Sequence, residues 1–189
     1  MAWAAGPRVF LLRVGSKLWL ERPAWFLNNW WMLIWKERFK PGPTLVIIEP
    51  AQKRMVVLRD VHHPFCIVCG DQNNQGLKVP FQACANGGVE ARFSFNGAFQ
   101  GYNGLVHGGV IASLLDGAMT NCLFSHGKAA VTGELTVRYL LPAKANLEAV
   151  VTAWIKESWS PLHMTEAQMI QDGRVVARAT AKFMESDIV

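Results

Sequence analysis

Beyond residue 88, several segments carry the hydrophobic pattern of β-strands. From Val89 to Phe95 every second residue is apolar, as expected for a strand with one face in the core and the other in water. Asp172-Gly173 is a strong signal for a hairpin turn. Longer strand candidates span residues 130–141, 146–158, 162–171 and 174–184. Their order predicts a run of neighbouring antiparallel strands.

The segment from Gly108 to Phe124 follows a different pattern and predicts a helix. It is apolar, contains no proline, and has Asp116 as its single charged residue. A helix that is apolar on nearly all sides is buried, and here a sheet must wrap around it. The chain is therefore predicted to have an α+β hotdog fold, in which an antiparallel sheet wraps around one long central helix.

The first 43 residues differ in composition from the rest. They contain six of the eight tryptophans, with seven Lys/Arg against two Glu, whereas residues 44–189 hold twelve charges of each sign. Residues 23–40 predict a helix that begins with proline, ends in basic residues and is stopped by Pro41-Gly42-Pro43. Such a helix suits a membrane interface. It is equally compatible with packing on the domain or on a partner subunit, or with an extension of little function.

Residues 44–60 predict two short strands or one hairpin. Apolar runs at 44–48 and 55–58 flank Glu49-Pro50-Ala51-Gln52, and residues 62–74 are loop-like. We therefore divide the chain into an N-terminal helical and hairpin extension, residues 1–60, and a hotdog domain, residues 61–189.

Charge and hydropathy narrow the classes of partner. The neutral charge balance beyond residue 43 argues against a nucleic-acid-binding domain. No apolar run reaches the roughly 18 residues of a membrane-spanning helix. We expect a cytoplasmic protein, with peripheral membrane contact through residues 1–43 as the one membrane role to consider.

The cysteines are predicted to be free thiols. The chain is long enough to bury a core without disulfides. Cys66 and Cys69 have the spacing of half a zinc knuckle, and His62 and His63 lie nearby. Tetrahedral sites usually combine two separated pairs, however, and adjacent histidines rarely bind one ion together. Packing thiols are therefore favoured over a zinc site or a redox pair, and we predict no metal and no cofactor.

Several short motifs follow one another in a fixed order across residues 64–184. They are Cys66-Ile67-Val68-Cys69-Gly70 with Asn74-Gln75-Gly76-Leu77, Gln100-Gly101 with Gly104 and Val106-His107-Gly108-Gly109, Leu114-Leu115-Asp116, and Val137-Arg138-Tyr139-Leu140-Leu141-Pro142. Together they resemble the PaaI-like branch of hotdog acyl-CoA thioesterases, in the thioesterase superfamily. That family usually has arginine in place of Leu141, and residues 1–60 match nothing in it.

The resemblance implies hydrolysis of an acyl-CoA to a free acid and CoA. A thioester carbonyl needs donors for its developing negative charge and a base or nucleophile for its carbon. The Gly108 N–H, with Gly109 as a second donor, is assigned to the oxyanion because a helix start offers free N–H groups. Asp116 is assigned as general base or nucleophile. His107 either orients the turn, bonds near the carbonyl or simply caps the helix.

Two threonines are candidates for the partner of the Asp116 carboxylate. Thr132 lies at the position of a threonine that assists the acid in the resembling enzymes, and it is the preferred candidate. Thr120 lies one helical turn after Asp116 and is its rival. The other expected substrate contacts are Gly109, Asn103, Thr120 and Arg138.

One helix cannot place both catalytic groups on one thioester. Asp116 lies eight residues beyond Gly108, or roughly 12 Å along a helix at about 1.5 Å per residue. Reacting groups must approach within about 3–3.5 Å. We therefore expect a homodimer in which Gly108 of one subunit faces Asp116 of the other. A tetramer built from two such dimers is the alternative assembly. The alternatives are a non-catalytic acyl-CoA sensor docked at a membrane surface, and a hotdog hydratase or dehydratase.

Overall fold

The computed structural model describes residues 13–14, 17–18 and 48–186, and the chain divides into two compact units, Met1–Gly42 and Pro43–Val189. In the first unit, β1 (Arg13–Val14) pairs with β2 (Lys17–Leu18) in antiparallel orientation. The helix predicted for residues 23–40 lies outside the described residues. Along the described part of the chain, no helix is both long and apolar enough to cross a membrane.

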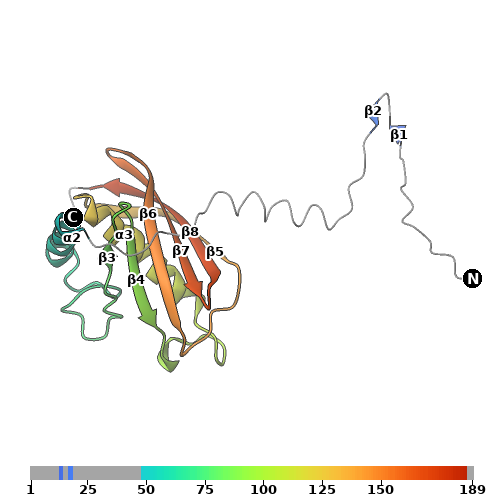
Figure 1. Cartoon of the computed structure of the whole chain (residues 1–189), viewed down its shortest axis with the longest axis horizontal. Coiled ribbons are helices and arrows are strands. Elements are labelled where there is room, and N and C mark those ends of the chain that lie inside the picture. The colour runs from blue at the N-terminus through green and yellow to red at the C-terminus, as the bar shows by residue number, and fades with distance from the viewer. Residues whose placement is uncertain (1–12, 15–16, 19–47, 187–189) are drawn as a thin grey trace, which may run out of the picture. The chain divides into compact units, whose positions relative to one another are not determined.

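The second unit is a six-stranded antiparallel sheet curled around one long helix, α3 (Figure 1). The strand order is β3-β4-β6-β7-β8-β5, and every neighbouring pair is antiparallel. The elements are β3 (Gln82–Ala83), β4 (Val89–Ser94), α3 (Gly108–Ser125), β5 (Ala130–Tyr139), β6 (Glu148–Trp159), β7 (Leu162–Gln171) and β8 (Arg174–Glu185). The predicted hotdog fold and its long strands are confirmed.

Helix α3 is enclosed on every side along its second half only. From Gly117 to Ser125 every residue is buried, and strands β4 to β8 supply much of the cover. In the first half, Ile111, Leu114 and Leu115 are buried as well. In the first two turns Gly109 and Ser113 are exposed. The expectation of a helix enclosed on all sides is therefore wrong for its N-terminal part, which the subunit leaves open to solvent.

A helix, α2 (Glu49–His62), replaces the second strand predicted for residues 44–60, whereas residues 44–47 of the first lie outside the described residues. Pro50 and Glu49 favour a helix start, and Arg59 and His62 favour its end. Only Met55 is fully buried, where α2 packs against α3; such a side chain contributes about 1.5–3 kcal/mol.

The apolar run at residues 55–58 has the composition of a short buried strand, but the four residues do not share one buried face. Val57 is instead 51% exposed, and the run turns around the helix. The predicted loop from residue 62 to 74 is confirmed, except that His62 closes the helix. The compact unit that holds the sheet thus includes α2 as well as residues 61 onward.

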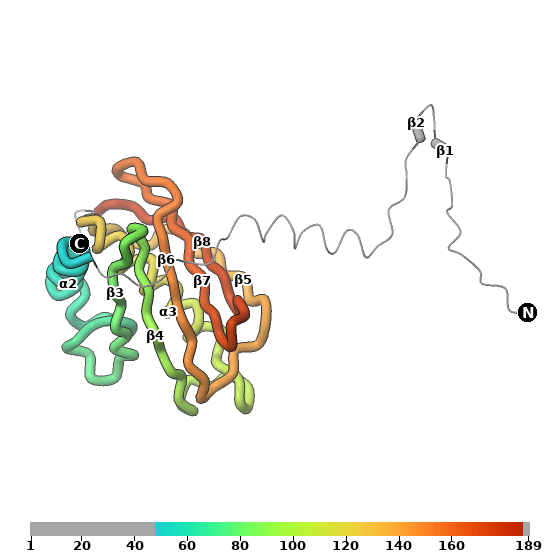
Figure 2. Tube along the Cα trace, in the orientation of Figure 1, coloured from blue at the N-terminus to red at the C-terminus, as the bar shows by residue number. Residues whose placement is uncertain are grey.

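Strand β5 forms one edge of the sheet (Figure 2), and no other described strand pairs with its outer side. A β-bulge after Thr132 interrupts its pairing with β8 before Glu134. Much of the strand and of the turn that follows is exposed, including Val131, Tyr139 and Leu140. An apolar, unpaired edge is a ready surface for a second chain.

Candidate active site

The start of α3 presents one free backbone donor. The Gly109 N–H donates to Nδ1 of His107 at 2.9 Å, so His107 caps the helix and occupies the Gly109 donor. The Gly108 carbonyl accepts a hydrogen bond from the Tyr139 hydroxyl at 2.7 Å. The Gly108 N–H has no acceptor among residues 48–186. The helix start therefore offers the Gly108 N–H, on the positive end of the helix dipole, to a ligand.

A cavity of about 440 Å³ opens beside this donor. Its wall includes both His107 and Gly108, and Tyr139 closes one side. A Cβ on Gly108 would lie 3.3 Å from the Tyr139 ring, so glycine keeps this wall open. The remaining lining is mostly apolar: Gly101, Tyr102, Leu105, Val106, Ile111, Leu140, Leu141, Pro142 and Ala143. The Asp116 side chain lies outside this set.

The Asp116 carboxylate bonds to one of the two candidate threonines. Thr132 Oγ1, from β5, donates to Asp116 Oδ1 at 2.8 Å. Thr120 Oγ1 donates to the backbone carbonyl of Asp116 at 3.0 Å and does not bond the carboxylate. The structure therefore brings Thr132 to the acid and uses Thr120 inside the helix.

Burial changes the acidity of Asp116. Removal of the carboxylate from water is the largest cause and raises its pKa; the Thr132 hydrogen bond partly opposes this. Cys66 raises the pKa of Asp116 further through its negative charge, and His63 lowers it. The net direction is upward, which makes the ionised carboxylate a stronger base than an exposed aspartate.

The loop after α2 lies against α3 close to Asp116, a neighbourhood that sequence reasoning missed. Val68 packs on Gly117, where an added Cβ would lie 2.5 Å from Val68 Cγ1. Asn121 Nδ2 donates to Cys69 Sγ at 3.3 Å. The nearest signal in the sequence is the glycine that follows Asp116, because only glycine permits this close approach.

The two loop cysteines interact with each other. A hydrogen bond from Cys69 is the largest cause that lowers the pKa of the Cys66 thiol, and the same contact raises the pKa of Cys69. Both thiols are free. Cys66 is thus the thiol that ionises in this pair.

The remaining predicted contacts are dispersed. Asn103 is exposed in the turn before α3 and is absent from the cavity wall. Arg138 lies on β5 opposite Arg178 of β8. A second cavity of about 640 Å³ shares Leu105, Leu141 and Pro142 with the first and is lined by Lys144 and Arg174. Lys156 of β6 is paired with Glu166 of β7 at 2.9 Å.

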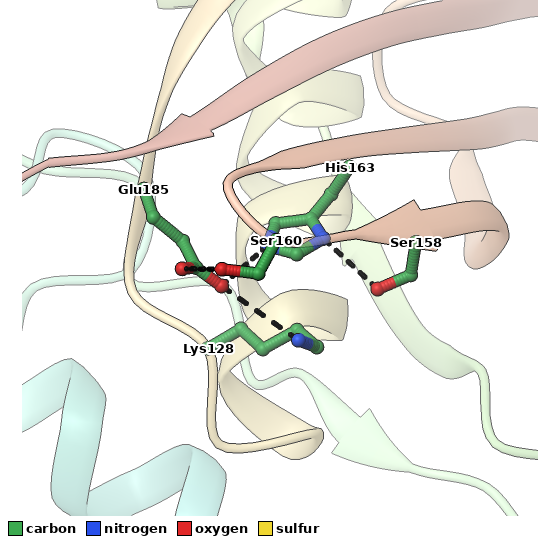
Figure 3. Close-up of polar contacts among 5 residues, drawn as sticks. All are labelled: Lys128, Ser158, Ser160, His163 and Glu185. Atoms are coloured by element: carbon green, nitrogen blue, oxygen red, sulfur yellow. Dashed lines mark hydrogen bonds and ion pairs between the residues drawn. The ribbon is translucent and has the colours of Figure 1, made fainter.

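A second polar cluster has the composition of a catalytic triad but a different role (Figure 3). The His163 ring has a hydrogen-bond partner at each nitrogen. Ser158 Oγ lies 2.9 Å from Nδ1, and Glu185 Oε1 lies 2.8 Å from Nε2. Ser160 donates to Glu185 Oε2 at 2.6 Å, and Lys128 Nζ lies 3.7 Å from Oε1. The His163 side chain is fully buried with both nitrogens engaged, so the cluster ties together the ends of β6, β7 and β8.

The family model of the thioesterase superfamily matches residues 103–178, which run from the turn before α3 into β8. No curated protein matches the chain. Its matches among solved structures are extensive. One is a thioesterase superfamily protein, 23% identical over 86% of this chain and 76% of that one, with a TM-score of 0.61. Another is the Escherichia coli PaaI protein from the phenylacetic acid degradation operon, 18% identical over 75% and 96%, with a TM-score of 0.63.

A third similar structure contains coenzyme A. It is a hypothetical thioesterase from Streptococcus pneumoniae, 19% identical over 57% of this chain and 88% of that one, with a TM-score of 0.54. Two further structures with the same protein title are alanine mutants, one of an aspartate and one of a threonine sixteen positions later. At these identities the likeness shows the fold, which is the PaaI-like hotdog fold.

Proposed function

We propose that this member of the thioesterase superfamily, with its PaaI-like hotdog fold, is an acyl-CoA thioesterase. It hydrolyses an acyl-CoA to the free acid and CoA, and the chemical step uses no metal or other cofactor. One observation carries the proposal. The only charged side chain of α3 is the desolvated Asp116, and the same helix begins with an unused N–H beside an apolar cavity.

The Gly108 N–H is proposed as the oxyanion donor. As the hydroxide oxygen adds to the thioester carbon, the carbonyl oxygen becomes negative, and a donor fixed in advance stabilises it without reorganisation. His107 has already engaged the neighbouring Gly109 amide, and Tyr139 fixes the peptide plane at the Gly108 carbonyl. His107 is therefore proposed as a positioning residue. Gly109 shapes the turn, and its N–H donates to His107 and not to the substrate.

Asp116 is proposed to activate water or to attack the carbonyl directly, forming an anhydride that water then hydrolyses. Either role requires the ionised carboxylate, and Thr132 supports that form through its hydrogen bond. In the Streptococcus pneumoniae thioesterase, an aspartate and a threonine with the same separation were each replaced by alanine. This correspondence supports Asp116 and Thr132 as the reacting pair.

The complete site is proposed to need two subunits. Asp116 contributes nothing to the cavity beside its own Gly108, and the two lie roughly 12 Å apart along α3. The open first turns of α3 and the unpaired β5 edge would face a second copy and bring its Gly108 to Asp116. We propose a homodimer, with a tetramer as a further assembly of dimers.

The CoA portion is proposed to follow the basic side of the adjoining cavities. Lys144 and Arg174 line the second cavity, and Arg138 lies on β5 near its end. Guanidinium and ammonium groups bind phosphates through charge-assisted hydrogen bonds. The bound coenzyme A in the Streptococcus pneumoniae structure supports a CoA ligand for this fold. Membrane contact through residues 1–43 stays a prediction from their tryptophans and basic charge.

A substrate panel tests the proposal. Purified full-length protein is assayed with short-, medium- and long-chain and aromatic acyl-CoAs, and released CoA is detected with a thiol reagent. We expect turnover of at least one class, and a loss of at least about a hundredfold in kcat for Asp116→Asn. Asp60→Asn, which changes an exposed carboxylate on α2 away from both cavities, is the matched control and should keep full activity.

Two results would redirect the assignment. Tight acyl-CoA binding without turnover identifies a non-catalytic sensor. Water addition to an enoyl-CoA without CoA release identifies a hydratase; the use of His107 Nδ1 as a helix cap argues against that activity. Full hydrolysis by Asp116→Asn contradicts the proposed site.

A further inference from the structure

We propose that His63, Cys66 and Cys69 form a zinc-binding site that fastens the loop after α2 onto the catalytic helix. The ligand atoms of these three residues all lie within 4.8 Å of one another. One histidine and two cysteines are a ligand set that zinc uses, with water in the fourth tetrahedral position. Only one of the two adjacent histidines takes part, which removes the objection that adjacent histidines rarely bind one ion together, and water takes the place of a second pair of ligands.

The spacing of the three atoms suits a single ion. Zinc binds sulfur at about 2.3 Å and imidazole nitrogen at about 2.0–2.1 Å, so its tetrahedral ligands lie roughly 3.5–3.8 Å apart. Closing from at most 4.8 Å therefore requires small rotations of side chains already facing one another. Cys69 is buried, while His63 and Cys66 are half-buried, which leaves a route for the ion and for one water.

The backbone around Cys66 is folded as a tight turn directed at its sulfur. The Val68 N–H donates to Cys66 Sγ at 3.4 Å, and the Gly70 N–H donates to the Cys66 carbonyl at 2.9 Å. A Cβ on Gly70 would lie 2.4 Å from the Cys66 nitrogen, so the turn requires glycine. Backbone N–H groups aimed at a sulfur favour the thiolate, which is the form that binds a metal.

His63 supplies an independent sign of a missing partner. Its Nδ1 is buried and has no hydrogen-bond partner among residues 48–186. The ring is held edge-on against Phe124, with centroids 5.0 Å apart and an interplanar angle of 82°. Buried polar atoms are almost always satisfied. A bound ion would satisfy the imidazole where packing alone leaves it without a partner.

The second cysteine has outer contacts typical of a metal ligand. Asn121 of α3 donates to Cys69 Sγ at 3.3 Å and to the Gly117 carbonyl through the same nitrogen, at 2.8 Å. Outer hydrogen bonds of this kind orient ligands and tune a metal. The ion would thus fix the loop after α2, and the Asn121 hydrogen bond would link its Cys69 ligand to α3, a little over one turn beyond Asp116.

A disulfide explains these contacts less well. It would bring the two sulfurs to about 2.05 Å and leave His63 Nδ1 without a partner. Packing of free thiols leaves the buried His63 Nδ1 without a partner. With Nδ1 as its third ligand atom, zinc accounts for this nitrogen and for the N–H directed at Cys66 together.

Metal binding by the full-length protein tests the proposal. Protein purified under reducing conditions is stripped with a chelator and titrated with Co²⁺, whose thiolate charge-transfer and tetrahedral d–d absorption bands report the ligands. We expect one Co²⁺ per chain, displaced by Zn²⁺, and a higher Tm with metal. Cys66→Ser/Cys69→Ser should lose the bands, and His63→Ala should bind at least roughly tenfold more weakly. Cys84→Ser, which removes a buried thiol outside the cluster, should bind like the parent.

These readouts do not depend on thioesterase activity. The proposed metal site can therefore be disproved while the proposed function holds, and the proposed function can be disproved while the metal site holds. Circular dichroism checks the fold of each variant, and His63→Ala decides the matter if the double variant does not fold. Equal Co²⁺ uptake by the parent and His63→Ala overturns the proposal. So does a reduced parent protein that binds no Co²⁺, including one recovered with a Cys66–Cys69 disulfide.

Discussion

At the scale of single residues, the proposed site depends on the Asp116 carboxylate, which must be a strong base and still be ionised when the substrate binds. Burial raises the pKa of Asp116, and the Thr132 hydroxyl lowers it by donating to the charged form. The two effects oppose each other, so activity should rise as the pH rises through the pKa of Asp116. Below that pKa the carboxylate is protonated and can neither activate water nor attack.

Replacing Thr132 by valine isolates the hydroxyl. Thr132→Val removes the donor and keeps the shape, so the pKa of Asp116 should rise further and the acidic limb of log kcat/KM should move to higher pH. Thr120→Val is the matched control, because Thr120 bonds only the Asp116 backbone carbonyl. A profile that is unchanged in Thr132→Val, or shifted equally in both variants, contradicts the assigned role.

The partner of the Asp116 carboxylate was predictable because spacing along the chain carried the information, while the catalytic roles of Asp116 and Thr132 stay predictions. The sixteen-residue separation and the family resemblance pointed to Thr132, and the two hydroxyls are indeed used differently. The neighbourhood of His63, Cys66 and Asp116 was not predictable, because it depends on how α2 and its loop lie on α3. No pattern in the sequence predicts how α2 and its loop pack on α3.

At the scale of elements, alternating and all-apolar patterns predicted strands and the central helix reliably. Buried positions must be apolar, so burial imposes these patterns on the sequence. The four long strands and α3 were found within a few residues. Helix α2 was missed because it buries one side chain, Met55, and a run such as Met55-Val56-Val57-Leu58 satisfies a strand equally well when burial is unknown. Pro50, at the first turn, was the overlooked signal.

The ends of β6, β7 and β8 are joined by the His163 cluster, and Glu185 is its acidic member. Ser160 is the largest cause that lowers the pKa of Glu185, followed by His163. A depressed pKa in the folded state stabilises the protein above the ordinary value near 4.5, and the contribution is lost as the pH falls through the lowered value. The cluster should therefore support stability at neutral pH and not in acid.

Glu185→Gln tests this contribution. The variant should have a lower Tm than the parent at neutral pH, and the difference should shrink as the pH falls below 4.5 and through the lowered pKa of Glu185. Thermal unfolding followed by circular dichroism at several pH values measures it. Glu148→Gln, which breaks an exposed pair with Arg92, should change Tm little at any pH. A difference in Tm that persists unchanged in acid contradicts the electrostatic explanation.

At the scale of the whole molecule, the subunit has one side on which the sheet edge and the start of the central helix are both exposed. Strand β5 ends the sheet with an unpaired, partly apolar edge, and α3 is open at Gly109 and Ser113. The sequence pointed to a dimer only through the length of α3, because the surface that a second copy would cover is visible in three dimensions alone. If two copies share each site, two different inactive variants should restore one another.

Gly108→Pro and Asp116→Asn are the two variants. Proline removes the N–H at the first helical position, where it is well tolerated, and His107 already has the extended backbone that precedes proline. It also adds a Cβ 3.3 Å from the Tyr139 ring, and Gly108→Ala adds the same atom, so alanine controls for this bulk. Alone, Gly108→Pro should lose about a hundred- to a thousandfold in kcat, while Gly108→Ala, which keeps the N–H, should lose far less.

Co-refolding the two inactive variants in equal amounts should recover about a quarter of parental activity, because half of the molecules are mixed dimers and each has one intact site. That intact site combines Gly108 of the Asp116→Asn chain with Asp116 of the Gly108→Pro chain. Steady-state CoA release measures the recovery, and size-exclusion chromatography verifies the dimers. Activity no higher than the sum of the separate variants would show that each subunit carries its own complete site, or that these two groups do not act on one thioester.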